Sequence, residues 1–130
     1  MQYSVAVRNA GLNAKVAAIG EGSVLKVRTK AMPEACSSPD VGLALATVQL
    51  PADWMQPAEN GQIDMSGVWR TMRADLSGAA EHFRIYHNDI CHIQGSVGTG
   101  LQSDMQITNP WLFGGQPFEI ERFTIVDNNG

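Results

Sequence analysis

Cysteine, basic charge and long apolar runs are all scarce in this sequence of 130 residues. Two cysteines, Cys36 and Cys91, cannot build a structural zinc site alone, and a reducing compartment favours free thiols over a disulfide. The chain has nine basic and 13 acidic residues, for a formal charge of -4. This balance does not favour binding to nucleic acid or to an anionic membrane surface. No apolar run suits a membrane span or a signal peptide, so we expect a protein made in a cytoplasm.

Motifs for catalysis and for cofactor binding are also missing. There is no nucleophile elbow of the G-x-S-x-G type, and the carboxylates are scattered over strand ends and loops. Gly98-Thr99-Gly100 lacks the lysine and the helix of a phosphate loop. His87 and His92 fall on one face of a predicted hairpin and His82 on the other, but no third metal ligand accompanies them. We therefore expect surface or interface histidines, no metal, no cofactor and no enzyme activity.

One amphipathic helix is predicted at the start of the chain, over residues 4–20. Ser4 can cap its first turn, and Gly20 can close its last turn. Its apolar stripe recurs at helical spacing and consists of Val5, Leu12, Val16 and Ile19. Such a helix either covers an open end of its own sheet or docks on another chain.

A β-hairpin over residues 79–97 is the central feature that the sequence predicts. Two alternating segments flank Asn88-Asp89, a pair suited to a two-residue turn. The register that follows pairs His87 with Ile90, Tyr86 with Cys91, Ile85 with His92, Arg84 with Ile93, and Phe83 with Gln94.

The rest of the chain contains short alternating segments separated by turn residues. With the hairpin they make about eight strands at intervals of roughly ten residues, which is typical of a sandwich or barrel. We predict one domain over residues 1–130, with an antiparallel, jelly-roll-like β-sandwich over 23–126 and the helix outside it. Residues 30–40, with two prolines, form a long loop that lies on a binding surface or is mobile. Trp54 is expected to be buried in the core beneath a turn. A bulge at Glu121-Arg122 is expected to keep Phe118, Ile120, Phe123 and Ile125 on one face.

An apolar loop near the end of the chain is the least expected feature. Residues 109–115 place three bulky apolar side chains between turn formers, where an exposed loop is usually polar. The loop either folds onto the core or forms a contact with a partner. The candidate contact residues are therefore those of the loop and of the helix: Trp111, Leu112, Phe113, Val5, Leu12 and Val16.

Several segments resemble a family of small virion proteins of tailed phages and prophages. They cover nearly the whole chain: Y-S-V-A-V-R-N-A-x-L-N-A-x-x-A-x-I-G (3–20), L-K-V-R-T (25–29), L-P-A-D-W-M (50–55), A-D-L-S-G-A-A-E-H-F-R-I-Y (74–86), C-H-I-Q-G-S-V (91–97) and G-G-Q-P-F-E-I-E-R-F-T-I (114–125). Residues 110–113 depart from the family, whose members look more polar there.

The resemblance implies a structural role without catalysis. The role that fits best is a decoration or cement protein on the outside of an icosahedral head, assembled in the host cytoplasm. Its partners would be the major capsid protein and copies of itself, as a dimer or trimer. A tail or head-completion component is the second possibility. The third possibility rests on the fold class and not on the resemblance. It is a carbohydrate-binding module, because jelly rolls bind sugars on aromatic side chains and this chain has four candidates: Trp54, Trp69, Trp111 and Tyr86.

Overall fold

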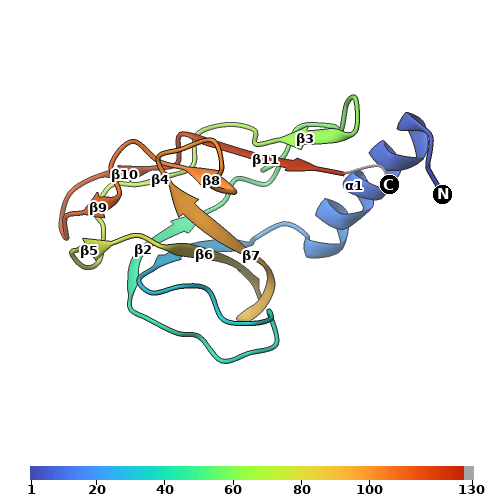
Figure 1. Cartoon of the computed structure of the whole chain (residues 1–130). Coiled ribbons are helices and arrows are strands. Elements are labelled where there is room, and N and C mark those ends of the chain that lie inside the picture. The colour runs from blue at the N-terminus through green and yellow to red at the C-terminus, as the bar shows by residue number, and fades with distance from the viewer. Residues whose placement is uncertain (128–130) are drawn as a thin grey trace.

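The computed structural model describes residues 1–127, and it shows a strand-built body with one helix at one end (Figure 1). The prediction of a mainly β protein with a single N-terminal helix is confirmed. The elements are α1 (Val5–Ile19), β1 (Val24–Arg28), β2 (Ala44–Gln49), β3 (Gln62–Asp64), β4 (Arg70–Thr71), β5 (Gly78–Ala79), β6 (His82–His87), β7 (Ile90–Gly98), β8 (Met105–Gln106), β9 (Trp111–Leu112), β10 (Phe118–Glu119) and β11 (Arg122–Val126).

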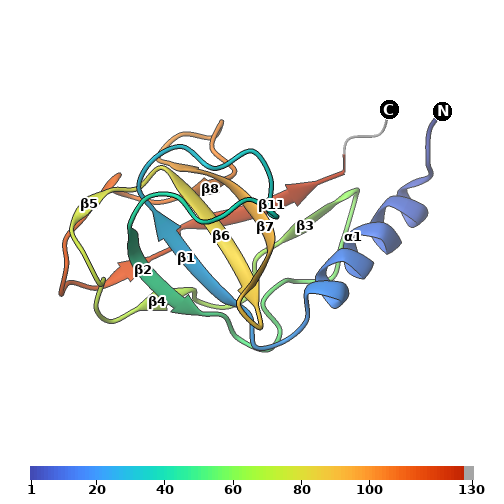
Figure 2. The ribbon, with the colours of Figure 1, turned by 90° about the horizontal axis from the view of Figure 1, so that it is seen from below.

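Seven strands form one sheet in the order β2-β1-β6-β7-β8-β11-β3, and two pairs, β10-β4 and β5-β9, stand apart. The long strand β7 runs from the layer of β1, β2 and β6 into the layer of β8 and β11 (Figures 1 and 2). One sheet thereby covers both sides of the core. All pairs are antiparallel except β7 with β8, which corrects the expectation of a wholly antiparallel sheet.

The predicted hairpin is present, with its turn where the sequence places it. Asn88 and Asp89 have φ of 51° and 63°, the left-handed values that a tight two-residue turn requires. His87 pairs with Ile90 and Tyr86 with Cys91, as predicted.

The predicted register fails beyond those two pairs because an irregularity lies between Ile85 and Tyr86. Ile85 pairs with Ile93 instead of His92, since His92 is the extra residue of a bulge. The remaining pairs shift with it, to Arg84 with Gln94 and Phe83 with Gly95. The bulge moves Ile93 to the core face and Gln94 to the opposite face.

Aromatic side chains join the two layers through the core. Phe83 of β6 meets Phe123 of β11 edge to face, with ring centroids 5.3 Å apart. Phe123 contacts Trp69 at 5.6 Å, and Trp69 contacts Trp54 at 6.0 Å. The prediction that Trp54 is buried beneath its turn is therefore confirmed. This row of rings fixes the spacing of the layers, because each ring fills the space between them.

The last segment is divided into two strands, β10 and β11, in place of the single strand with a bulge at Glu121-Arg122 that the sequence predicts. β10 pairs with β4, whereas β11 pairs with β8 and β3 of the large sheet. Phe118, Ile120 and Phe123 are nevertheless all buried, as the sequence pattern predicts.

Helix α1 begins and ends as predicted. The Ser4 hydroxyl accepts a hydrogen bond from the backbone N–H of Val7 at 3.2 Å, and Gly20 follows the last turn with φ of 88°. The C-terminal part of the helix packs on the body, where Leu12 and Ile19 are buried. Figure 2 shows the first turns of the helix extending away from the strands.

Polar side chains of α1 anchor it to the segment before β3. Asn9 accepts a hydrogen bond from the N–H of Gly61 at 2.8 Å, and Asn13 accepts one from the N–H of Ala58 at 2.9 Å. Arg8 donates to the carbonyl oxygen of Asp127 at 2.7 Å. The helix thus covers one end of its own sheet, which is the first of the two roles expected for it.

The close approach of β7 to Phe83 indicates that any side chain at Gly95 destabilises the fold. A Cβ at Gly95 would lie 2.7 Å from Cε1 of Phe83 and 2.7 Å from a carboxylate oxygen of Asp104. We expect Gly95→Ala to lower the free energy of unfolding by about 1–3 kcal/mol, because Phe83 must leave its place between the layers. Urea unfolding measures the change.

Gly11→Ala is the matched control for that substitution. Gly11 lies within α1, and a Cβ added to it would meet nothing within 4 Å, so alanine adds helix propensity without a clash. We expect it to raise the free energy of unfolding by up to about 1 kcal/mol. Equal effects of the two substitutions would contradict the packing argument.

Candidate functional site

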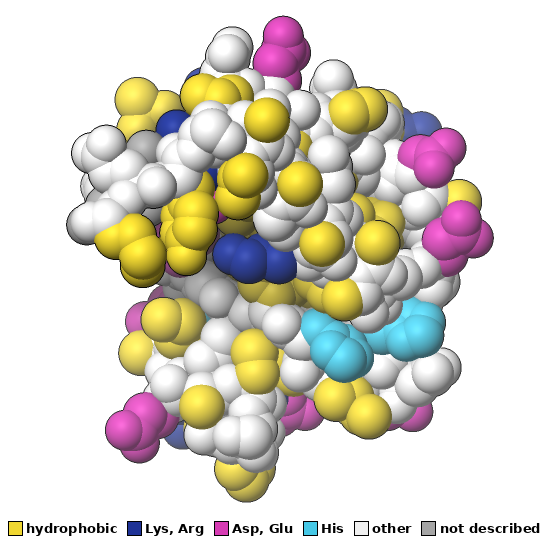
Figure 3. Space-filling view, turned by 90° about the vertical axis from the view of Figure 1, so that its right-hand side faces the viewer, with side chains coloured by type: hydrophobic (Ala, Val, Ile, Leu, Met, Phe, Trp, Pro, Cys, Tyr) yellow, Lys and Arg dark blue, Asp and Glu magenta, His cyan; other side chains and the backbone are white. Residues whose placement is uncertain are grey.

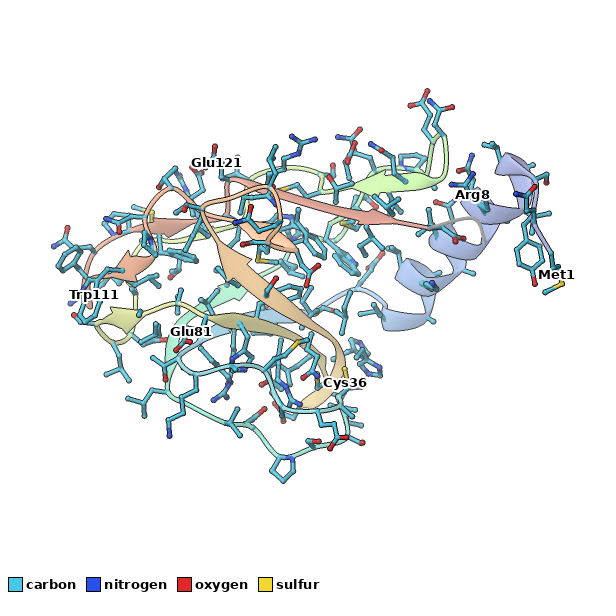
Figure 4. All side chains as sticks on the ribbon, in the orientation of Figure 1. Met1, Arg8, Cys36, Glu81, Trp111 and Glu121 are labelled. Atoms are coloured by element: carbon cyan, nitrogen blue, oxygen red, sulfur yellow. The ribbon has the colours of Figure 1, made fainter. Side chains whose placement is uncertain are left out.

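Three large apolar side chains are exposed at the end of the molecule opposite α1. Trp111 is 48% exposed, Phe113 is 56% exposed and Leu76 is also exposed. Leu76 lies beside the loop after β9, since its backbone is 3.3 Å from the position of a Cβ on Gly114. We call these three residues the distal edge, and Figure 4 shows Trp111 at the tip of the molecule.

The two-residue pairing of β9 with β5, which are far apart in sequence, positions Trp111 and the residues beside it. Trp111 pairs with Ala79 and Leu112 with Gly78, so neighbouring side chains point to opposite faces. Leu112 is buried, whereas Trp111 and Phe113 point outward. The expectation that the 109–115 loop folds onto the core therefore holds for Leu112 alone, whereas Trp111 and Phe113 remain exposed and keep the partner contact as a prediction.

Hydrogen bonds hold the backbone of this edge. The Asn109 side chain accepts from the N–H of Trp111 at 3.0 Å, and the Ser77 hydroxyl accepts from the N–H of Gly114 at 2.8 Å. Ala80 donates to the carbonyl oxygen of Pro110 at 2.8 Å. The exposed aromatic rings therefore sit on an ordered backbone.

A pocket of about 380 Å³ adjoins the distal edge. Its lining combines aromatic and polar side chains, among them Trp111, Phe113, Phe118, Arg70, Asn109 and Gln116. An apolar wall with several hydrogen-bonding groups suits a side chain or a loop of a partner.

The helix residues proposed as contacts are mostly internal. Leu12 is buried and Val16 is partly buried against the core, so neither forms a free surface, and Leu112 is likewise buried. This corrects the expectation for these three residues. The side chain of Val5 is 46% exposed and remains available, and Val7 beside it is also exposed.

A second cluster holds the long loop, residues 30–42, against the face of β6 and β7. One carboxylate oxygen of Asp40 accepts from Nη1 of Arg84 at 2.8 Å and from the hydroxyl of Tyr86 at 2.6 Å. The other oxygen accepts from Nη2 of Arg28 at 3.2 Å. We call Asp40, Arg28, Arg84 and Tyr86 the loop clamp.

Further hydrogen bonds extend the loop clamp along the loop. Nη2 of Arg84 donates to the carbonyl oxygen of Ala35 at 2.9 Å, and its Nε donates to the Gln94 side chain at 3.0 Å. Gln94 in turn donates to the carbonyl oxygen of Pro33 at 2.8 Å. The loop is therefore held in place against β6 and β7, although most of its residues are exposed on its outer side.

The loop clamp lowers the pKa of Asp40. Burial acts to raise this pKa, but hydrogen bonds from Tyr86 and Arg84 and the positive charges of Arg28 and Arg84 outweigh burial. The arrangement pairs every charged group of the clamp. Its role in the described residues is to fix the loop.

The three histidines do not converge. His82 is fully buried, against the expectation of a surface residue, and its Nδ1 lies 2.6 Å from the carbonyl oxygen of Lys30. Burial, as the first cause, lowers the pKa of His82. His87 and His92 lie side by side with ring centroids 6.3 Å apart, and Figure 3 shows histidines adjacent on the helix end. Within residues 1–127 no group of three metal-ligating side chains occurs.

Three of the four aromatic residues considered for a sugar platform are buried. Trp54 and Trp69 belong to the core, and Tyr86 belongs to the loop clamp. Of the four only Trp111 is exposed. A row of stacked sugar rings therefore has no row of aromatic side chains to bind.

Comparisons of the chain with protein-family models, with curated proteins and with solved structures find no match. Among the helices of the described residues, none has the length and apolar character that crossing a membrane requires.

The depressed pKa of Asp40 predicts how Asp40→Asn changes stability with pH. The charged carboxylate stabilises the fold above its ordinary pKa of 3.8, and this contribution is lost as pH falls through the lower pKa of the folded state. At neutral pH we expect the substitution to lower the free energy of unfolding by about 1–2 kcal/mol. The value is modest because the Asp40 side chain is 43% exposed.

The measurement is urea unfolding of the unchanged protein and of Asp40→Asn at pH 7 and at about pH 2.5. The difference between their free energies of unfolding is expected to be smaller at the lower pH. Asp53→Asn, at an exposed turn position, is the control and should leave the free energy of unfolding unchanged at both pH values. A gap that stays constant between the two pH values would argue against a charged clamp.

Proposed function

We propose that this chain is a structural protein of a tailed-phage virion without enzyme activity, and that it decorates the outside of the head shell. The observation that carries the proposal is the distal edge, where Trp111 on β9 and Phe113 just after it are both about half exposed. The sequence resemblance to small virion proteins supports the same role.

Large aromatic side chains on an ordered backbone are well suited to protein binding. They bring much apolar area to an interface and lose little side-chain entropy when it forms. A decoration protein also acts in many copies, so a modest contact for each copy adds up over the shell. The distal edge, with its adjoining pocket, is small enough for such a contact.

Two observations favour this proposal over chemistry on a substrate. The charged side chains that cluster in the loop clamp are fully used in holding the loop, and the buried His82 lies apart from the pair of His87 and His92. More than half of the residues that line the pocket beside Trp111 are apolar. These features suit binding better than catalysis.

A tail or head-completion component would use the same apolar edge, so the second role differs only in the partner. The carbohydrate role has a weaker basis, because it depends on Trp111 as the single exposed platform of the four proposed. Both roles are outcomes of the experiment below.

We expect Trp111→Ser with Phe113→Ser to reduce attachment to heads at least tenfold while the isolated domain stays folded. The assay is co-sedimentation of the purified chain with phage heads that lack it, followed by image reconstruction of the decorated particle. Both side chains are exposed, so their loss removes apolar contact area without opening the core.

Ile90→Ser is the matched control, because Ile90 is an exposed apolar residue at the β6–β7 turn, away from the distal edge. It should attach as the unchanged protein does. Full attachment of the double variant would contradict the proposed surface. Binding to tails instead of heads would favour the second role, and binding to a glycan array the third.

A further inference from the structure

The two cysteines of the chain meet at the loop clamp, although 54 residues separate them in sequence. Cys36 belongs to the 30–42 loop, and Cys91 is the second residue of β7. Both side chains are partly buried and both are free thiols. Figure 4 shows Cys36 beside the start of β7.

The register of the hairpin places Cys91 on the face that the loop covers. Cys91 pairs with Tyr86, so its side chain shares a face with Tyr86 and with Arg84 two residues away. Nη2 of Arg84 is 3.5 Å from the carbonyl oxygen of Cys36. One guanidinium therefore borders both cysteines and holds the loop backbone beside β7.

The thiol of Cys36 also affects the ionisation of Cys91. Burial, followed by the neighbouring thiol of Cys36, raises the pKa of Cys91 to about 12. The positive charge of Arg84 acts in the opposite direction but does not outweigh these effects. An effect of one thiol on the other requires that their side chains lie close together.

We propose that Cys36 and Cys91 form a reversible disulfide that covalently fastens the 30–42 loop to β7. The loop is already held there by hydrogen bonds from Arg84 to Ala35 and to Asp40, so the bond forms without moving the loop as a whole. This inference does not depend on the proposed virion role.

A small disulfide such as oxidised glutathione supplies the oxidant. The Cys36 thiolate attacks one of its sulfur atoms, which forms a mixed disulfide and releases one glutathione thiolate that takes up a proton. Cys91 then loses its proton and attacks Sγ of Cys36, which releases the second glutathione. Two protein thiols are oxidised and one glutathione disulfide is reduced to two thiols.

The order of the two attacks follows from the local chemistry. A thiolate is the attacking species, and the raised pKa keeps Cys91 protonated at neutral pH. Cys36 therefore reacts first with the external disulfide. Cys91 reacts second because the sulfur it attacks is then beside it, so its low thiolate fraction is offset by proximity.

The disulfide would respond to the compartment in which the protein resides. A reducing cytoplasm keeps both thiols free, and an oxidising exterior favours the bond. Closing the segment from Cys36 to Cys91 restricts the unfolded chain, so the oxidised protein is expected to melt about 10 °C higher than the reduced one.

The test incubates the full chain with oxidised glutathione at pH 8 and compares it with a sample kept under a phosphine reductant. We expect the oxidised monomer to lose both maleimide-reactive thiols and to lose about 2 Da in mass. Trypsin should then release residues 31–70 linked to residues 85–122, and reduction should separate them. The thermal midpoint should rise in the oxidised sample alone.

Cys36→Ser and Cys91→Ser are the controls. The Cys91→Ser variant should stop at a glutathione adduct on Cys36, and the Cys36→Ser variant should form its adduct at least tenfold more slowly. Neither variant should gain thermal stability on oxidation. Circular dichroism before oxidation checks that both variants are folded.

Three results would overturn the proposal. The oxidised monomer could keep two reactive thiols, it could carry stable glutathione adducts in place of an internal bond, or it could yield only dimers linked between chains. Each of these outcomes means that the two sulfur atoms do not reach one another in the folded chain.

Discussion

A buried guanidinium is the constraint on which much of this structure depends. The Arg84 side chain is only 2% exposed, on β6, which lies between β1 and β7 in the large sheet. A buried charge must be paired and hydrogen-bonded, because an unpaired one costs several kcal/mol. Asp40, Ala35 and Gln94 supply these partners, and two of them come from the 30–42 loop. The path of the loop is therefore a consequence of the need to pair one arginine.

Sequence reasoning succeeds for the local features of the hairpin and fails for those that depend on its bulge. Alternation and the Asn88-Asp89 pair predict the hairpin and its turn, because both are local properties of the chain. The bulge at His92 has no local sign, and it reverses the faces of the β7 residues that follow it. Alternation alone therefore pairs Arg84 with Ile93, whereas the structure pairs it with Gln94, whose amide completes the clamp.

Of the two candidate surfaces, the sequence reveals the distal edge in part and does not reveal the loop clamp. Asp40 lies 44 residues from Arg84, and no pattern in the sequence connects them. The available signal is an arginine that lies between two large apolar residues, Phe83 and Ile85, in a strand. The distal edge was easier to find, because apolar residues between turn formers are conspicuous. Even there, sequence could not decide which of the three residues faces outward, since that depends on the pairing of β9 with β5.

The two ends of the molecule differ in a way that bears on the proposed role. The distal edge presents Trp111 and Phe113 on backbone fixed by hydrogen bonds, whereas the first turn of α1 presents Val5 and Val7 at the other end. A protein with different apolar surfaces at opposite ends can contact two different neighbours, and this is compatible with the proposed cement role. The rigid body between the ends, with its aromatic row and its clamped loop, would set the distance between those neighbours.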